Sequence, residues 1–204
     1  SMTWRDLEGF FKVQGFDETV GEGNVIADVK DRHEWGINDS QFFQLVEQYL
    51  KNKSGDKPKF IFAMSTGTHP PYKMPDGYEP LPLEIPNQIR NMMSAKDFNN
   101  KSIFPLYQYA NRELAKFLSM VKNSDFAKNT IIAVTGDHNL RELSNHSQEN
   151  MFLRYAVPFY LYIPEELKKE NINVLLAGSH MDIMPTLYGL SLSETDYVSM
   201  GNDL

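Results

Sequence analysis

Short apolar runs that end abruptly in polar turns constrain the fold of this chain most strongly. Residues 59–65 read Lys-Phe-Ile-Phe-Ala-Met-Ser, and residues 130–135 read Thr-Ile-Ile-Ala-Val-Thr. Runs of this length with an apolar interior are typical of strands buried on both faces, as in a parallel sheet. Residues 157–163 form a third such run, and residues 172–176 a weaker fourth. The sequence therefore predicts a sheet in the core of the fold.

Helical patterns alternate with these runs. Apolar stripes at helical spacing predict four helices: residues 3–14 up to Gly15, a segment from Asn38 or Asp39, residues 106–121, and a segment from near Asp182 with Pro185 in its first turn. The stripes place Phe42, Phe43 and Phe117 in the core. Strands that alternate with helices indicate an α/β fold, with a parallel or mixed sheet and helices on both faces.

The chain has no linker-like boundary, so residues 1–204 are expected to form one domain or part of one. Residues 69–105 carry seven of the 11 prolines and predict a long irregular loop, a kind of segment that is often functional. Ser1 precedes Met2 as the remnant of a tag would. We therefore expect the chain to be cut from a longer protein.

Charge and cysteine content exclude several classes of function. The net charge is −7, and an acidic chain lacks the basic face that nucleic acid requires. Cysteine is absent, which excludes disulfides and thiolate metal sites. Hydrophobic residues make up 41 % of the chain, enough for an ordinary globular core.

Two predicted strands end in residues that can carry chemistry. The run at 59–65 leads to His69, and the run at 130–135 leads to Asp137 and His138. If both strands point the same way, these three side chains emerge at one edge of the sheet, where ligand sites form in α/β folds. Asp137 and His138 together offer oxygen and nitrogen ligands that suit Zn²⁺ or Mn²⁺.

Each candidate also has a structural interpretation. Asp137 could cap a following helix with His138 on the surface, and His69 could be a polar loop residue rather than a contact to a substrate oxyanion or a proton donor. His146 lies in a polar stretch that either covers the site or is simply solvated. His180 is expected to cap or pack near the start of the last helix.

Five segments, taken in order, resemble the sulfatase-like enzymes of the alkaline phosphatase superfamily. They are Asp31-Arg-His-Glu-Trp-Gly-Ile-Asn-Asp39, Ser65-Thr-Gly-Thr-His-Pro-Pro-Tyr72, Thr135-Gly-Asp-His138, Val157-Pro-Phe-Tyr-Leu-Tyr-Ile163 and Ser179-His-Met-Asp-Ile-Met-Pro-Thr186. Within that superfamily they are most similar to the phosphoglycerol transferases of the lipoteichoic acid synthase type. The resemblance implies a three-layer α/β/α sandwich with a mainly parallel sheet, truncated on its N-terminal side.

The resemblance assigns roles to individual residues. Asp137 and His138 match the metal-binding Asp-His pair, and His69 matches a histidine that contacts substrate. Trp4 and Arg5 resemble a segment that holds the phosphoglycerol head group, and His146 falls where related transferases place another substrate histidine. The family's nucleophilic threonine and its acidic metal ligand lie upstream of the segments that this chain matches. We therefore expect weak metal binding and no turnover from the chain alone.

The resemblance also predicts a function for the whole protein. It implies a transferase that depends on a divalent ion (Mn²⁺ or Zn²⁺, with Mg²⁺ or Ca²⁺ as alternatives) and moves a phospholipid head group to a glycan or glycerol acceptor. Such an enzyme would be anchored by N-terminal helices at the extracytoplasmic face of a bacterial membrane. A sulfatase that cleaves sulfate esters, and a binding module without activity, are the alternatives. An exposed sheet edge is expected to favour dimers.

Overall fold

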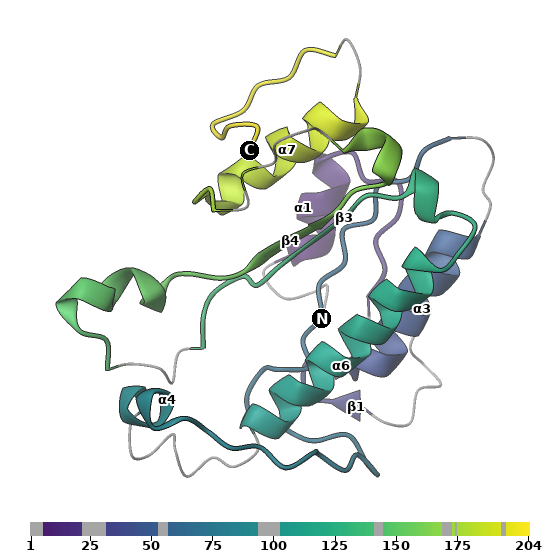
Figure 1. The fold of residues 1–204 in the computed structure, drawn as a ribbon. Helices are drawn as coiled ribbons and strands as arrows, with labels where there is room; N and C mark the ends of the chain where they lie inside the picture. The colour runs from purple at the N-terminus through teal and green to yellow at the C-terminus, as the bar shows by residue number, and fades with distance from the viewer. Residues whose placement is uncertain are drawn as a thin grey trace. The chain divides into compact units, whose positions relative to one another are not determined.

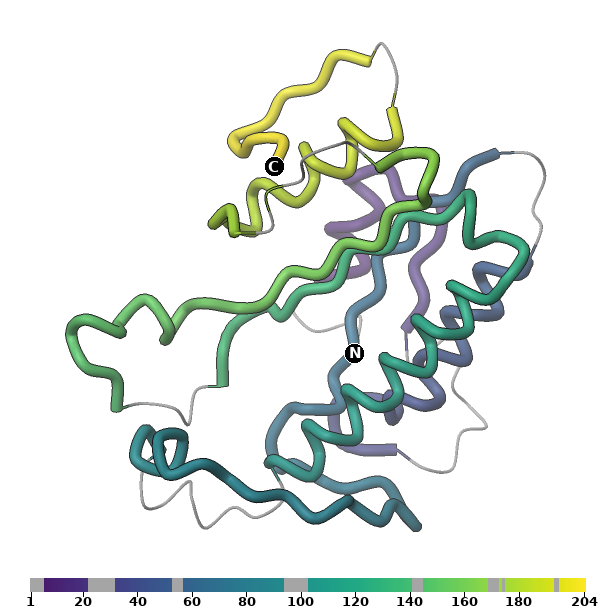
Figure 2. The backbone as a smooth tube through the Cα atoms, in the orientation of Figure 1, coloured from purple at the N-terminus to yellow at the C-terminus, as the bar shows by residue number. Residues whose placement is uncertain are grey.

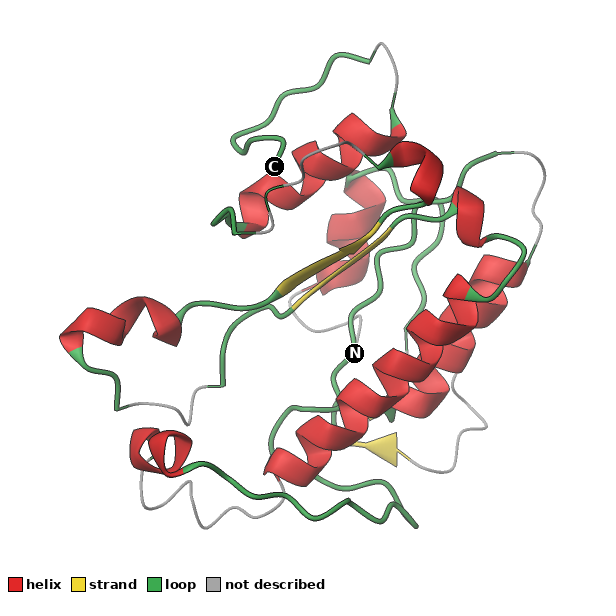
Figure 3. Ribbon diagram, in the orientation of Figure 1, coloured by secondary structure: helices red, strands yellow, loops and turns green. Residues whose placement is uncertain are grey.

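The computed structural model describes residues 6–21, 32–52, 57–93, 103–140, 145–168, 173, 175–192 and 195–204. The chain divides into two compact units, residues 1–120 and residues 121–204. In this described part, helices predominate and the strands are short, as Figure 3 shows. Among the same residues, no helix is both long enough and apolar enough to cross a membrane.

The first unit is built mainly of helices. It contains α1 (Leu7–Val13), β1 (Arg32–His33), β2 (Gly36–Ile37), α3 (Asp39–Lys51), α4 (Asn87–Met92) and α6 (Ile103–Lys122), whose end lies just inside the second unit. β1 and β2 form a short antiparallel hairpin. α1 confirms the first predicted helix: its Asp6 carboxylate accepts a hydrogen bond from the Gly9 N–H at 3.3 Å, and Gly15, at φ 86°, follows its end.

Helices α3 and α6 run side by side and contact each other through aromatic side chains (Figure 1). The rings of Phe43 and Phe117 stack across the two helices at 5.1 Å, and Phe42 packs edge-on against Phe43 at 5.2 Å. On the inner side of α6, Leu106 and Tyr109 are almost completely buried. The two predicted helices are thus confirmed, whereas Phe42, Phe43 and Phe117, which were predicted to lie in the core, are only half-buried.

The apolar run at 59–65 differs from its prediction. It is not a strand in the described structure, and Phe60, Phe62 and Met64 are each at least half exposed. The side chains of Phe62 and Phe60 pack instead against Phe11 and Phe16, at ring distances of 5.3 and 5.7 Å. A buried strand needs neighbouring strands for its backbone groups, and no described segment pairs with this run.

The second unit contains an antiparallel strand pair. β3 (Ile132–Thr135) and β4 (Phe159–Tyr162) pair so that Thr135 lies opposite Phe159. Both strands were predicted, but the expected parallel arrangement is wrong for this pair. The connection between them contains the 3₁₀ helix η3 (Gln148–Arg154) and returns to the same end of the pair, whereas a parallel pair requires a crossover to the opposite end. The predicted fourth strand lies partly outside the described residues, and its Leu175 is in a turn.

Helix α7 (His180–Ser191) confirms the last predicted helix but begins earlier than expected. Its N-cap is Ser179, which forms a capping box with Asp182. Pro185 therefore lies inside the helix and not in its first turn. Because proline has no N–H, the Met181 carbonyl receives no helical hydrogen bond from position 185. Gly201 packs at this point: a Cβ on Gly201 would lie 2.0 Å from the Met181 oxygen.

The chain end docks onto the start of α7, as the yellow segment in Figure 2 shows. The Asn202 N–H donates to the Asp182 carboxylate at 2.8 Å, and the Leu204 N–H donates to the Thr186 hydroxyl at 3.1 Å. Hydrogen bonds from Asn202 and Ser179 hold the pKa of the Asp182 carboxyl below its usual value. The final turn of the chain thus fixes the N-terminal turn of α7.

Candidate functional site

Asp137 and His138 follow directly after β3. The Asp137 carboxylate accepts a hydrogen bond from the His138 N–H at 2.8 Å, and the residues up to Leu140 are not helical. The interpretation of Asp137 as a helix cap is therefore not supported. Both side chains are open to solvent, with 84 % of the Asp137 side chain and 52 % of the His138 side chain exposed. Strand β3 thus delivers a carboxylate and an imidazole together at its C-terminal end.

The spacing of these two side chains suits a shared divalent ion. The His138 Nε2 and Asp137 Oδ2 atoms lie 3.5 Å apart. Two ligand atoms that each lie about 2.1 Å from one tetrahedral ion are about 3.4 Å apart. The donor set and its spacing fit Zn²⁺ or Mn²⁺. In the part of the chain that is described, however, no group of three or more acidic or histidine side chains could hold a metal ion, so the pair supplies only part of a coordination shell.

His180 fixes the backbone immediately before this pair. It is the first residue of α7, and its Nε2 lies 2.7 Å from the Gly136 carbonyl oxygen. The sequence predicted only a structural role at the start of the last helix. The hydrogen bond adds to that role a direct link between α7 and the end of β3.

The other site residues predicted from the sequence stay predictions. Trp4 and Arg5 lie outside the described residues. His146 is half-buried and lies shortly before η3, in a segment without regular structure. Asp137, His138 and His146 belong to the second unit and His69 to the first. The predicted convergence of His69 with Asp137 and His138 at one sheet edge therefore also stays a prediction.

In the first unit, His69 lies on an irregular loop that two consecutive turns shape. The His69 N–H donates to the Thr66 carbonyl at 3.2 Å, and the Tyr72 N–H donates to the His69 carbonyl at 3.1 Å. The imidazole packs against Trp35 of the β1–β2 hairpin, with ring centroids 3.7 Å apart. His69 is exposed but held by these contacts, so it is more than a free polar residue on a loop.

A buried carboxylate lies at the base of the same loop. Asp39, the first residue of α3, is 1 % exposed, and its Oδ2 atom has no hydrogen-bond partner among the described residues. Burial raises the pKa of the Asp39 carboxyl, while a hydrogen bond with Ser65 and the nearby His33 oppose the rise. A Cβ on Gly67 would lie 2.0 Å from Asp39 Oδ2. The sequence predicted Asp39 only as a start of the second helix. Its contact with Ser65 and Gly67 joins segments that are distant in sequence, so no local pattern indicates it.

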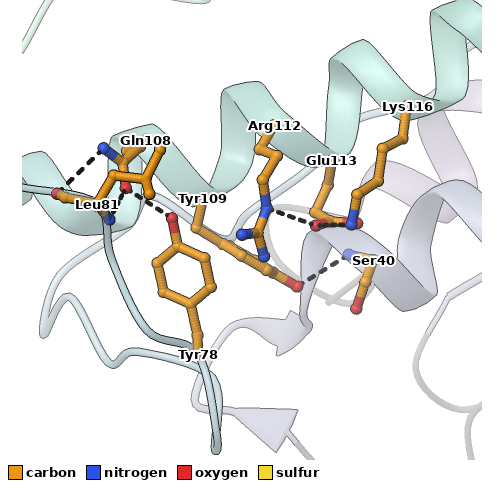
Figure 4. A network of polar contacts seen from close by, with 8 residues as sticks. All are labelled: Ser40, Tyr78, Leu81, Gln108, Tyr109, Arg112, Glu113 and Lys116. Carbon is orange, nitrogen blue, oxygen red and sulfur yellow. Dashed lines mark hydrogen bonds and ion pairs between the residues drawn. The ribbon is translucent and has the colours of Figure 1, made fainter.

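A polar network ties the proline-rich loop to α6 (Figure 4). The Tyr78 hydroxyl and the Leu81 N–H both donate to the Gln108 side-chain oxygen at 2.9 Å. Next to them, the Tyr109 hydroxyl accepts a hydrogen bond from the Ser40 N–H at 3.1 Å. The Asn38 side chain makes no capping hydrogen bond at the start of α3, so Tyr109 satisfies one of the free N–H groups there.

The same network includes a buried acidic residue on α6. Glu113 is 7 % exposed, and its carboxylate lies 2.8 Å from the Lys116 ammonium and 3.4 Å from the Arg112 guanidinium. The Arg112 guanidinium also lies over the Tyr78 ring, 4.5 Å from its centroid. α6 thus anchors both α3 and the loop that follows His69.

Comparison with known proteins identifies the family. Residues 1–191 match the sulfatase family. The chain belongs to this family. The resemblance drawn from the five sequence segments is thereby confirmed.

Several relatives of this sulfatase-family chain are named as transferases or synthases. It is 24 % identical over 212 residues to the lipoteichoic acid synthase-like protein YvgJ of Bacillus subtilis, covering 97 % of the chain and 31 % of the relative. It is 28 % identical over 137 residues to phosphoglycerol transferase I of Citrobacter koseri, covering 63 % of the chain and 16 % of the relative. The chain therefore spans less than a third of the length of these relatives.

Two solved structures share the fold. One is the lipoteichoic acid synthase LtaP from Listeria monocytogenes, with a TM-score of 0.69 and 20 % identity over 100 % of the chain and 50 % of the structure. The other is a protein of the alkaline phosphatase superfamily from Vibrio parahaemolyticus, with a TM-score of 0.66 and 23 % identity over 93 % of the chain and 42 % of the structure. The sulfatase-family chain thus has an alkaline phosphatase-like fold.

Proposed function

We propose that the chain is the C-terminal part of the catalytic domain of a metal-dependent phosphoglycerol transferase. The observation that carries the proposal is the Asp137–His138 pair beyond β3, with donor atoms 3.5 Å apart. The chain belongs to the sulfatase family, and relatives of it are named as phosphoglycerol transferases and as a lipoteichoic acid synthase-like protein. The substrate that this assignment implies is the head group of a membrane phospholipid.

Asp137 and His138 would hold the divalent ion with one carboxylate oxygen and one imidazole nitrogen. The bound ion would lower the pKa of a hydroxyl nucleophile and offset negative charge on the phosphoryl oxygens. The close approach of Asp137 and His138 requires a fixed backbone, which the His180 contact to Gly136 provides. The remaining ligands and the nucleophile are not assigned to residues of this chain, so weak metal binding and no turnover are expected when it is tested alone.

His69 binds an oxygen of the transferred phosphoryl group or gives a proton to the leaving alkoxide. In the first step the threonine oxygen forms a bond to phosphorus, and the bond between phosphorus and the diacylglycerol oxygen breaks. Diacylglycerol leaves with the proton, and the glycerophosphoryl group stays on the threonine. In the second step the oxygen of a glycan or glycerol hydroxyl forms a bond to phosphorus, the bond between phosphorus and the threonine oxygen breaks, and the hydroxyl proton passes to the threonine. Such a reaction takes place at the extracytoplasmic face of the membrane, where envelope polymers are assembled.

The test compares Asp137→Asn with the wild-type sequence in the whole protein. Diacylglycerol release from phosphatidylglycerol vesicles with Mn²⁺ is expected to fall at least ~10²-fold, because a ligand of the ion is lost. Asp196→Asn is the matched control, since Asp196 is an exposed aspartate of the same unit. Full activity of Asp137→Asn would refute the proposal.

The same assay separates the alternatives. A protein that releases sulfate from an aryl sulfate ester, and no diacylglycerol, is a sulfatase. In the 204-residue chain, Mn²⁺ is expected to broaden the NMR signals of His138 selectively, and Asp137→Asn should weaken this broadening. If the whole protein releases neither product and Mn²⁺ broadens no signal near His138, the chain is a binding module of the same fold.

A further inference from the structure

Trp35 makes several contacts with the His69 loop, through its indole ring and through its backbone carbonyl. Its ring packs on the His69 imidazole with centroids 3.7 Å apart and an interplanar angle of 37°. Its Nε1–H donates to the Pro70 carbonyl at 2.9 Å. Its own carbonyl accepts a hydrogen bond from the Thr66 hydroxyl at 3.2 Å. One residue of the β1–β2 hairpin thus holds the loop before, at and after His69.

The hairpin holds Trp35 itself in place. The Trp35 N–H donates to the His33 Nδ1 atom at 3.2 Å, and the His33 Nε2 atom lies 3.1 Å from the Ile37 carbonyl. Ile37 is buried, and Gly36 has a φ of 149°. A Cβ on Gly36 would lie 3.2 Å from the Thr66 hydroxyl oxygen. The turn and the loop therefore meet at a distance that glycine suits best.

The hydrogen bonds at Pro70 determine which nitrogen of His69 is available to a ligand. The His69 Nδ1 atom lies 2.9 Å from the Pro70 carbonyl oxygen. A carbonyl oxygen can only accept, so Nδ1 carries the proton, and the two lone pairs of this oxygen serve Nδ1–H and the Trp35 Nε1–H together. Nε2 is left as the free nitrogen of the ring. It accepts a hydrogen bond from a hydroxyl when the ring is neutral and donates to an anionic oxygen when the ring is protonated.

We propose that Trp35 is a positioning residue for His69. Through the tilted ring contact and the shared Pro70 carbonyl, Trp35 fixes the plane of the imidazole and keeps its Nδ1–H on that carbonyl. Nε2 is thereby directed to the substrate, where the protonated ring donates a hydrogen bond to a phosphoryl or sulfuryl oxygen. The contact of Nε2 with the substrate rests on the proposed transferase activity, whereas the positioning of the imidazole ring does not.

NMR of the 204-residue chain tests the positioning. The imidazole protons of His69, identified through a His69→Gln variant, are expected at upfield positions because the indole face shields them, and the ¹⁵N shifts should report a proton on Nδ1. Trp35→Leu should remove the shielding and mix the tautomers. Trp35→Phe should keep much of the shielding, because it retains an aromatic face but lacks the Nε1–H donor. Tyr107→Leu, which truncates an exposed aromatic ring of α6, is the matched control and should leave His69 unchanged.

Kinetics of the whole protein test the consequence. A misplaced catalytic contact costs on the order of 10²-fold, so Trp35→Leu should lower kcat/KM by about 10- to 100-fold, mainly through kcat. Trp35→Phe should recover most of the loss. Unshifted His69 signals in the wild-type chain, or a Trp35→Leu protein with wild-type kinetics alongside an impaired His69→Gln protein, would overturn the proposal. Loss of the transferase assignment itself would instead appear as an Asp137→Asn protein with full activity, so the two failures can be told apart.

Discussion

Substitution of Gly67 by alanine tests the buried contact at the base of the His69 loop. Gly67 is buried, and an added Cβ would lie 2.0 Å from Oδ2 of Asp39. Real Cβ atoms essentially never approach a neighbour closer than 3.0 Å, so the carboxylate would have to move by at least 3.0 − 2.0 = 1.0 Å. The Asp39 carboxylate has little room to move, because the residue is 1 % exposed and its side chain is hydrogen-bonded to Ser65. The substitution should therefore displace the start of α3 or the loop.

The magnitude follows from three contributions. Overpacking of a well-packed site costs about 1–3 kcal/mol, and loss of the Ser65 hydrogen bond adds about 1 kcal/mol. Alanine also lowers the conformational entropy of the unfolded chain, which offsets about 0.4–1 kcal/mol of this loss of stability. The net loss of unfolding free energy is then about 2 kcal/mol, which corresponds to a fall in Tm of about 4–8 °C for a chain of this length.

The assay is urea denaturation of four proteins: wild type, Gly67→Ala, Asp39→Ala and the double variant. In the Asp39→Ala background the carboxylate is gone, so Gly67→Ala should cost little, and the coupling energy should exceed about 1 kcal/mol. Gly136→Ala is the control for glycine replacement, because its Cβ would meet Val157 at 3.3 Å and the His138 carbonyl oxygen at 3.7 Å, and neither lies closer than 3.0 Å. An equal cost of Gly67→Ala in both backgrounds would refute the assignment of the cost to Asp39.

Two further predictions concern the ends of α3 and α7. Tyr109→Phe removes the acceptor of the Ser40 N–H and should cost about 1 kcal/mol in thermal unfolding, whereas Tyr107→Phe on the exposed face of α6 should cost nothing measurable. Because hydrogen bonds from Asn202 and Ser179 lower the folded-state pKa of Asp182, its contribution to stability is complete above the unfolded value of about 3.9 and is lost as the pH falls through the folded pKa. Stability measured between pH 5 and pH 2 should therefore fall less steeply in Asp182→Asn, and equal slopes would contradict the role of this carboxylate.

The sequence predicted α1, α3, α6 and α7 because their signal is local, but it missed α4, which lies within the predicted loop at residues 69–105. The apolar stripes of α3 and α6 are set by residues three and four positions apart. Leu106 and Val121 of the α6 stripe are buried, whereas the stripe residues of α3 are only half-buried. The strand at 59–65 was predicted from composition alone, and composition does not supply a pairing partner. Its aromatic side chains pack instead against Phe11 of α1 and against Phe16. No pattern within the run indicates these contacts.

The antiparallel pairing of β3 and β4 could not be predicted for a related reason. Each run has the apolar interior that is common in parallel sheets, but strand direction depends on the path of the connecting segment. In its described residues, 136–140 and 145–158, that segment carries η3 and no crossover helix. The composition of a strand reports its burial, whereas its direction is a property of the topology.

The candidate site shows the same division between local and distant information. Asp137 and His138 are adjacent in sequence, so their shared position beyond β3 could be predicted, and the structure adds the distance between their donor atoms. The residues that contact the His69 loop are distant in sequence: Trp35 of the β1–β2 hairpin packs on His69 itself, and Asp39 at the start of α3 contacts Ser65 and Gly67 before it. Sequence motifs thus identify the residues that could touch a substrate, while the residues that fix their orientation become visible only in the fold. For this chain, the functional consequence is that substitutions at Trp35 and at Asp137 should differ in kind. Under the two proposals, the first is expected to alter the geometry of His69 in the chain itself, and the second is expected to remove a ligand whose effect requires the ion.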